Sequence, residues 1–268
     1  VNLLTGIRSA EWIMIAITII QTVLVTIPLW QYFAGEGDRL RTKHYQAWQV
    51  IALANGRGGD GGRRQALQDL QEDGIALRGI EIPGAILDSL QLPGAGMKRA
   101  NLRDAILTNA TLTGAKFGRA TLTRTRFVSS SMQAGDLSFA RADSAVFNGT
   151  ALCTALMIAT DLRGAQFVGA RLDGVNFRGA DLRGARFGSL ADATGITFRD
   201  ANVAGMRAPD TFIRAALANG AVVMDSAAWA AKHTEDEPGL KKLWADIPNP
   251  YKAVTQESLA ACPPAPGY

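Results

Sequence analysis

Few residues of this chain have the types and spacing that catalysis requires. The two histidines, His44 and His233, lie far apart in the sequence. Asp136, Asp161 and Asp181 each directly precede a bulky apolar residue. A carboxylate at this position can form local hydrogen bonds, so we interpret the three aspartates as structural. We find no nucleophile–base pair and no spacing typical of a metal site. The sequence therefore predicts a non-enzymatic protein without metal or cofactor.

The two cysteines, Cys153 and Cys262, are too few for a disulfide framework. No basic residue adjoins Cys153 in the sequence to activate it as a nucleophile. We expect two reduced thiols in a cytosolic compartment, with Cys153 facing outward beside the core residue Leu152.

A period of five residues runs through the middle of the chain. Every fifth residue from Leu77 to Phe187 is bulky and apolar, with Ala142 as the exception, and the residue two places earlier is usually small. This period fits neither an α-helix nor a flat strand. It fits a solenoid in which each pentad forms one side of a coil. We predict that these two positions point inward and that the other three face water.

Predicted core residues that lie 20 positions apart in the sequence are of similar type. This step aligns Leu107 with four phenylalanines, namely Phe127, Phe147, Phe167 and Phe187. Residues one coil apart stack in a solenoid, so this step predicts four pentads per coil and a square cross-section. Residues 75–208 would then make about six coils at the usual strand spacing.

Three pentads carry a family resemblance: residues 100–104 (ANLRD), 160–164 (TDLRG) and 180–184 (ADLRG). They resemble the A(D/N)LXX unit of the pentapeptide-repeat family. The resemblance implies an all-β solenoid, a right-handed quadrilateral β-helix. It implies little about activity, because a fold does not settle a function. The family includes mimics of DNA that bind DNA gyrase, but mimicry needs an acidic surface, and residues 75–208 hold 16 Lys and Arg against 10 Asp and Glu.

Two sets of outward residues are candidate binding surfaces. The first is a protein-contact patch of apolar residues in outward slots, formed by Phe139, Val146, Leu156 and Ile158. The second is a basic face that could bind anionic lipid or nucleic acid, formed by Lys98, Arg103, Arg163, Arg178 and Arg183. Base-stacking aromatic residues are absent from the outward slots, which disfavours nucleic acid.

An apolar segment near the N-terminus predicts a transmembrane helix. No charged residue occurs between Trp12 and Phe33, and a helix of this length rises about 33 Å, enough for a hydrocarbon core. Trp12 at one end, and Trp30 and Tyr32 at the other, would be membrane-interface anchors. Basic residues are more frequent after this segment than before it. We therefore expect a single-pass protein of the inner (cytoplasmic) membrane with its C-terminal domain in the cytoplasm.

The sequence after the repeats predicts a cap that closes the β-helix. The register slips by one residue after Phe187, which indicates a bulge or loop near Gly195. Asp225 and Ser226 can start a short helix through Lys232. The predicted organisation has four parts: a transmembrane anchor (1–35), a juxtamembrane helix, Gly-rich loop and N-terminal cap (36–74), the β-helix (75–208), and a C-terminal helical cap with an extended tail (209–268).

These features predict a scaffold or accessory subunit. A rigid β-helix tied to a membrane helix would bind other protein subunits of an inner-membrane complex, such as a respiratory, photosynthetic or secretion assembly, and would contact the lipid bilayer. A homodimer is compatible with this architecture. The alternative is binding of anionic lipid or nucleic acid by the basic face.

Overall fold

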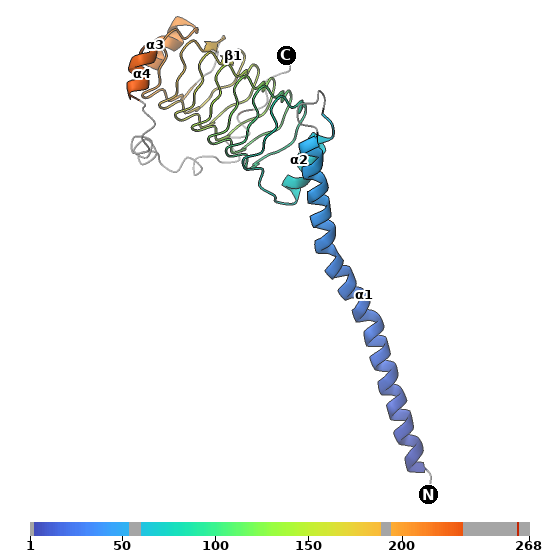
Figure 1. The fold of residues 1–268 in the computed structure, drawn as a ribbon. Coiled ribbons are helices and arrows are strands. Elements are labelled where there is room, and N and C mark those ends of the chain that lie inside the picture. Colours follow the sequence, from blue (N-terminus) through green and yellow to red (C-terminus); the bar gives the residue numbers. More distant parts are fainter. Residues whose placement is uncertain (1–2, 54–59, 189–193, 233–261, 263–268) are drawn as a thin grey trace. The chain divides into compact units, whose positions relative to one another are not determined.

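The computed structural model describes residues 3–53, 60–188 and 194–232, together with Cys262. Its elements are α1 (Leu3–Leu53), α2 (Arg63–Glu72), β1 (Gln166–Phe167), β2 (Arg186–Phe187), α3 (Asp210–Ala218) and α4 (Ser226–Lys232). The chain divides into two compact units, Val1–Gln49 and Val50–Tyr268. The second unit contains the stacked coils seen in Figure 1.

The membrane prediction is wrong. Among the residues that the structure describes, no helix is both long and apolar enough to cross a bilayer. The prediction of a single-pass protein of the inner membrane with its C-terminal domain in the cytoplasm is therefore wrong, whereas contact with lipid stays a prediction. The predicted continuation of the N-terminal helix beyond residue 36 is present, because α1 runs as one helix to Leu53.

The second unit is a stack of coils joined by parallel backbone hydrogen bonds. Isolated bridges connect residues 20 apart, from Glu81↔Asn101 onward, and β1 pairs with β2 in the same parallel register. The N–H of Leu102 donates to the carbonyl of Thr121 at 2.8 Å, and the N–H of Thr121 donates to the carbonyl of Ala100 at 2.8 Å. Each coil therefore satisfies the backbone of its neighbours. The predicted step of four pentads per coil is confirmed.

The corners of the coils need a left-handed backbone. The residue two places after each core position has a positive φ, and many of these residues are glycines. Where the corner residue is not glycine, it is often a small polar residue, such as Asp104 (φ 60°) or Asn109 (φ 56°). Asn and Asp tolerate this conformation because their side chains can hydrogen-bond locally. This requirement explains the recurrence of glycine at the corner positions.

The interior of the coils is a ladder of stacked side chains. The rings of Phe127, Phe147, Phe167 and Phe187 stack with centroid distances of 5.3, 5.1 and 4.8 Å and nearly parallel planes. This ladder confirms the phenylalanine alignment predicted from the sequence. Small polar residues at the other inward position are satisfied from within, since the hydroxyl of Thr125 donates to the carbonyl of Leu102 at 2.8 Å.

Helices cover both ends of the coil stack (Figure 1). At the first end, Leu67 and Leu70 of α2 are fully buried, and Arg64 donates to the carbonyl of Asp88 at 3.1 Å. At the other end, the ring of Phe212 in α3 lies 5.1 Å from that of Phe187. These helices protect core side chains that have no further coil to pack against.

The slip in register after β2 is confirmed. The bridges change from a step of 20 to a step of 21 at Asn176↔Thr197 and Arg186↔Arg207. The ladder then continues through Asn202↔Val222, past residue 208. The predicted short helix is present as α4, whereas α3 has no counterpart in the predicted elements.

Replacing the corner residue Ala159 with glycine should stabilise the fold. Ala159 has a φ of 51°, and an L-residue in this region carries a steric cost that glycine avoids. We expect Ala159→Gly to raise the free energy of unfolding by about 1 kcal/mol, measured by thermal and denaturant unfolding. The control Ala155→Gly removes a buried methyl group at a position without positive φ, and it should destabilise. Equal effects of the two changes would contradict the prediction.

Candidate functional site

Two arginines of the predicted basic face are paired with aspartates. Arg163 donates from Nε and Nη2 to the carboxylate of Asp161 at 2.8 and 2.7 Å. Arg183 donates to Asp181 in the same way at 2.8 and 2.6 Å. In both pentads the aspartate precedes the core leucine and the arginine follows it, so the two side chains leave the same face. The hydrogen bonds from these arginines to Asp161 and Asp181 raise the pKa of Arg163 and Arg183.

A third pairing involves the corner residue Asp104. Arg124, one coil further on, donates to it from Nε and Nη2 at 2.6 and 2.7 Å, and Nε of Arg103 lies 3.5 Å from its carboxylate. The hydrogen bond from Arg124 holds the pKa of Asp104 below its usual range. Much of the positive charge on this face is therefore compensated within the β-helix.

The other two residues of the predicted basic face lie far from each other. Lys98 and Arg178 share a column, but Gly118, Ser138 and Ile158 occupy the three coils between them, by the 20-residue register. At the usual strand spacing, four coils separate them by about 19 Å. The structure therefore does not bring Lys98 and Arg178 together. Binding of an anion by either one stays a prediction.

The four residues of the predicted protein-contact patch do not form one exposed surface. Leu156 and Ile158 are buried, with exposed fractions of 8% and 0%. Phe139 is half-buried, and the guanidinium of Arg119 lies 5.6 Å from its ring centroid, within reach of a cation–π contact. Val146 is half-buried and belongs to another ladder, the one that contains Arg126. Protein contact by these residues stays a prediction.

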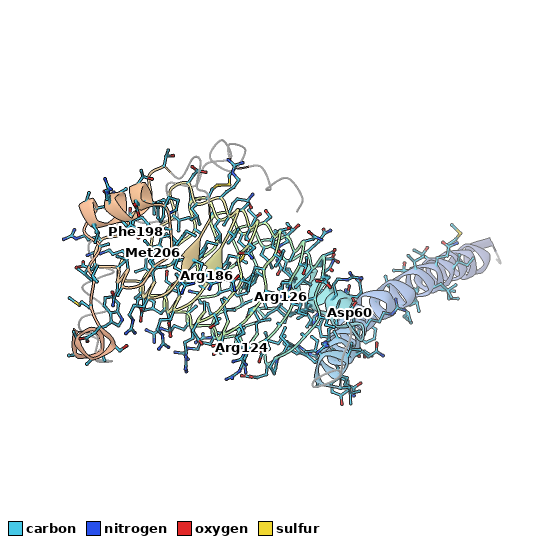
Figure 2. The ribbon with its side chains drawn as sticks, turned by 90° about the horizontal axis from the view of Figure 1, so that it is seen from above. Asp60, Arg124, Arg126, Arg186, Phe198 and Met206 are labelled. Atoms are coloured by element: carbon cyan, nitrogen blue, oxygen red, sulfur yellow. A yellow bond between two sulfur atoms is a disulfide. The ribbon has the colours of Figure 1, made fainter. Side chains whose placement is uncertain are left out.

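A different face of the coils carries arginines that form no ion pair with any acidic side chain in the described part of the chain. We call it the arginine–valine face, and its members are Arg126, Val128, Val146, Val168, Arg186 and Arg207. One parallel ladder of this face runs through Arg126, Val146, Gln166, Arg186 and Arg207 (Figure 2, where Arg126 and Arg186 are labelled). Arg207 was not predicted to join this ladder, because it aligns with Arg186 only when the one-residue slip after Phe187 is carried through the register.

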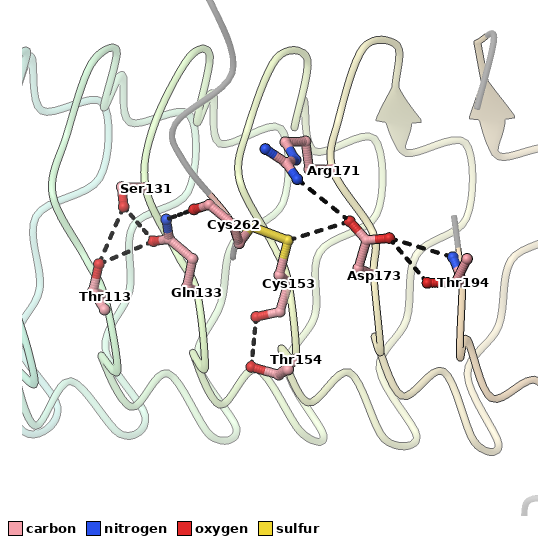
Figure 3. Close-up of a disulfide and its surroundings, with 9 residues drawn as sticks. All are labelled: Thr113, Ser131, Gln133, Cys153, Thr154, Arg171, Asp173, Thr194 and Cys262. Atoms are coloured by element: carbon pink, nitrogen blue, oxygen red, sulfur yellow. Dashed lines mark hydrogen bonds and ion pairs between the residues drawn. A yellow bond between two sulfur atoms is a disulfide. The ribbon is translucent and has the colours of Figure 1, made fainter. Parts of the chain in front are cut away.

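Cys153 and Cys262 form a disulfide, so the prediction of two reduced thiols is wrong. The residues are 109 positions apart in sequence, yet their Cα atoms lie 6.1 Å apart. Both are buried and pack with Ala151. Nε2 of Gln133 donates to the carbonyl of Cys262 at 2.9 Å, and the Oε1 atom of the same side chain accepts from the hydroxyl of Thr113 at 3.0 Å (Figure 3). The wall of the coils thus holds Cys262 by a covalent bond and by an oriented amide.

The remaining predicted residues form no common site. The side chain of Trp30 is exposed, and those of Trp12 and Tyr32 lie outside the described part of the chain. His44 lies in α1, and His233 is outside the described residues. Within the described ranges, no cluster of three or more His, Cys, Asp or Glu side chains is arranged to hold a metal ion.

Comparison with known proteins identifies the repeats. Residues 85–124 and 155–188 match the sequence model of the pentapeptide repeats, with eight copies. These two segments match the pentapeptide-repeat model. Pentapeptide-repeat proteins form right-handed quadrilateral β-helices, in agreement with the four pentads per coil seen here. No curated protein sequence matches the chain.

Three similar solved structures are also pentapeptide-repeat or resistance proteins. QnrB1, a plasmid-mediated fluoroquinolone resistance protein, is 21% identical, with 57% of this chain and 87% of that chain covered and a TM-score of 0.29. A pentapeptide repeat protein from the Arabidopsis thaliana thylakoid lumen is 22% identical, with coverage of 72% and 97% and a TM-score of 0.27. HetL from Nostoc, involved in heterocyst differentiation regulation, is 19% identical, with coverage of 55% and 97% and a TM-score of 0.16.

Loss of the disulfide should destabilise the stack of coils. The bond links residues 109 positions apart, and closure of a long loop restricts the unfolded chain. We expect Cys262→Ser to lower the free energy of unfolding by about 2–4 kcal/mol in the absence of reductant. As a control, a phosphine reductant should lower the melting temperature of the wild type to that of the variant and leave the variant unchanged. A wild type that is insensitive to reductant would refute the prediction.

The pair of Asp104 and Arg124 should make stability depend on pH. Because the folded-state pKa of Asp104 lies below its unfolded value, the contribution of this pair is present above about pH 4. It is lost as the pH falls through the folded-state pKa. The melting temperature of Asp104→Asn should therefore lie below that of the wild type at neutral pH, and the gap should narrow in acid. In an Arg124→Gln background, the same change should show little dependence on pH, and a gap of constant size in the wild-type background would argue against the pairing.

Proposed function

We propose that this chain is a non-catalytic scaffold that binds other proteins through the outer faces of its pentapeptide-repeat coils. The proposal rests on the environment of Cys262. There, outward positions of the coil wall bury a residue from a distant part of the chain, and the amide of Gln133 donates to its backbone carbonyl at 2.9 Å. The wall is thus able to bury peptide backbone and to hydrogen-bond it, which are the two requirements for binding a protein segment.

The regular coil backbone supports this proposal. Consecutive coils are joined by hydrogen bonds of about 2.6 to 3.0 Å, so outward side chains stand in columns at a fixed spacing. A partner that binds such a surface loses freedom while the scaffold loses little, because the scaffold is already ordered. The pairing of Arg163 and Arg183 with aspartates makes lipid or nucleic acid a less suitable partner for that face.

Site-specific photo-cross-linking tests the scaffold function. A photoreactive amino acid is placed at one exposed position on each face of the coils, in turn at Arg141, Val168, Thr111 and Arg99, and the full chain is produced in its native cells. A scaffold should give a discrete protein adduct from one or two faces and none from the others. Absence of a specific adduct from every face, in samples that retain the folded coils by circular dichroism, would refute the proposal.

A further inference from the structure

Arg186 and Arg207 are like charges on adjacent rungs of the arginine–valine face. They are directly bridged in the parallel ladder, and both side chains are exposed. Within the described residues, neither guanidinium forms a hydrogen bond or ion pair. Arg163 and Arg183 differ in this respect, because each donates to an aspartate of its own pentad.

Like charges that stand opposite each other on neighbouring strands are unfavourable. A carboxylate nearby would relieve the repulsion, but the ladder offers Gln166 and Val146 on the preceding rungs. In the described part of this face, the acidic residue is Asp88, which lies four coils before Val168 in the 20-residue register and accepts a hydrogen bond from the N–H of Thr108. Among the described residues, no carboxylate contacts the guanidinium of Arg186 or Arg207, so an anionic partner could pair with them.

Three valines lie on the same face, in the three coils that precede Arg186. Val168 is 46% exposed, and Val128 and Val146 are half-buried. The neighbour of Val168 is Gly188, where a Cβ atom would lie 3.2 Å from Cγ1 of the valine, so no side chain screens the valine on that side. Exposed valine next to uncompensated arginine matches a partner segment that carries both carboxylates and apolar side chains.

We propose that the arginine–valine face docks an extended acidic segment of another protein. Carboxylates of the segment pair with Arg186 and Arg207, and its apolar side chains pack on Val146 and Val168. The proposal rests on the scaffold function and names the chemistry of its partner. Charge complementarity selects an acidic polypeptide, and the exposed valine favours a segment with apolar residues over a purely charged polymer.

The test is a titration of the full chain with a fluorescent peptide of alternating Glu and Val. A peptide of alternating Lys and Val serves as the probe of opposite charge. We expect the Glu–Val peptide to bind and the Lys–Val peptide not to bind. The double variant Arg186→Gln/Arg207→Gln should bind the Glu–Val peptide about tenfold more weakly. Val168→Ser should also weaken binding, and a peptide of alternating Glu and Gly should bind more weakly than the Glu–Val peptide.

A matched control separates a specific site from net charge. The double variant Arg103→Gln/Arg124→Gln removes the same two charges from a face where both arginines adjoin Asp104. Its affinity for the Glu–Val peptide should stay within about twofold of the wild type. Equal losses in the two double variants, or no binding by the wild type at low salt, would overturn the proposal. Thermal unfolding verifies that each variant retains the coils.

The same titration tests two alternative occupants of the arginine–valine face. The chain has its own acidic run, Glu235, Asp236 and Glu237. If neutral amides at these positions raise the affinity for the Glu–Val peptide about tenfold, the occupant is this run and the proposal fails. A DNA duplex that binds more tightly than the peptide, with the same dependence on Arg186 and Arg207, would also overturn it.

The outcomes for the two proposals are separable. A protein adduct from another face, together with no peptide binding at Arg186 and Arg207, would leave the scaffold function standing and remove this docking site. Peptide binding at Arg186 and Arg207 without any protein adduct in cells would remove the scaffold function and the docking of another protein, and would leave only a site for acidic peptides on this face.

Discussion

The parallel hydrogen bonds between coils are the constraint on which the rest of this structure depends. They join residues 20 apart, as in the bridge Asn101↔Thr121. Every side chain therefore has fixed neighbours one coil before and one coil after it. Inside the coils this register stacks the phenylalanines, and outside it sets which charges meet. Core packing and surface chemistry follow from the same repeat.

The register makes the surface charge a local property of each column. Where a pentad has aspartate before its core residue and arginine after it, as in Asp161 and Arg163, the two charges pair within the pentad. Where arginine takes the position before the core residue, as in Arg186, the partner must come from the adjacent coil, and there the ladder supplies Arg207. A chain of modest net positive charge can thus contain both a compensated and an uncompensated face.

The wall of the coils has a second chemical role at the disulfide. Cys153 faces outward from a coil, as its position in the pentad indicates, but it is bonded to Cys262 and buried. Sequence spacing could not indicate this bond, because nothing in a stretch of 109 residues shows that its ends meet. Disulfides persist in oxidising environments, so the bond also removes the physical basis for expecting a cytosolic protein. The sequence pattern also did not indicate the burial of Leu156 and Ile158.

The sequence by itself determined the coil. A five-residue period with a bulky core position and a small one two places before it leaves few other ways to bury apolar side chains, and the 20-residue alignment of phenylalanines set the number of sides. It also indicated α4 and the slip after Phe187, because both are local features. Tertiary structure alone decided which arginines are compensated, which outward residues are covered and where Cys262 binds. Those properties depend on which segments meet in space, and a repeat pattern specifies the neighbours within the stack but not the contacts made by the chain that leaves it.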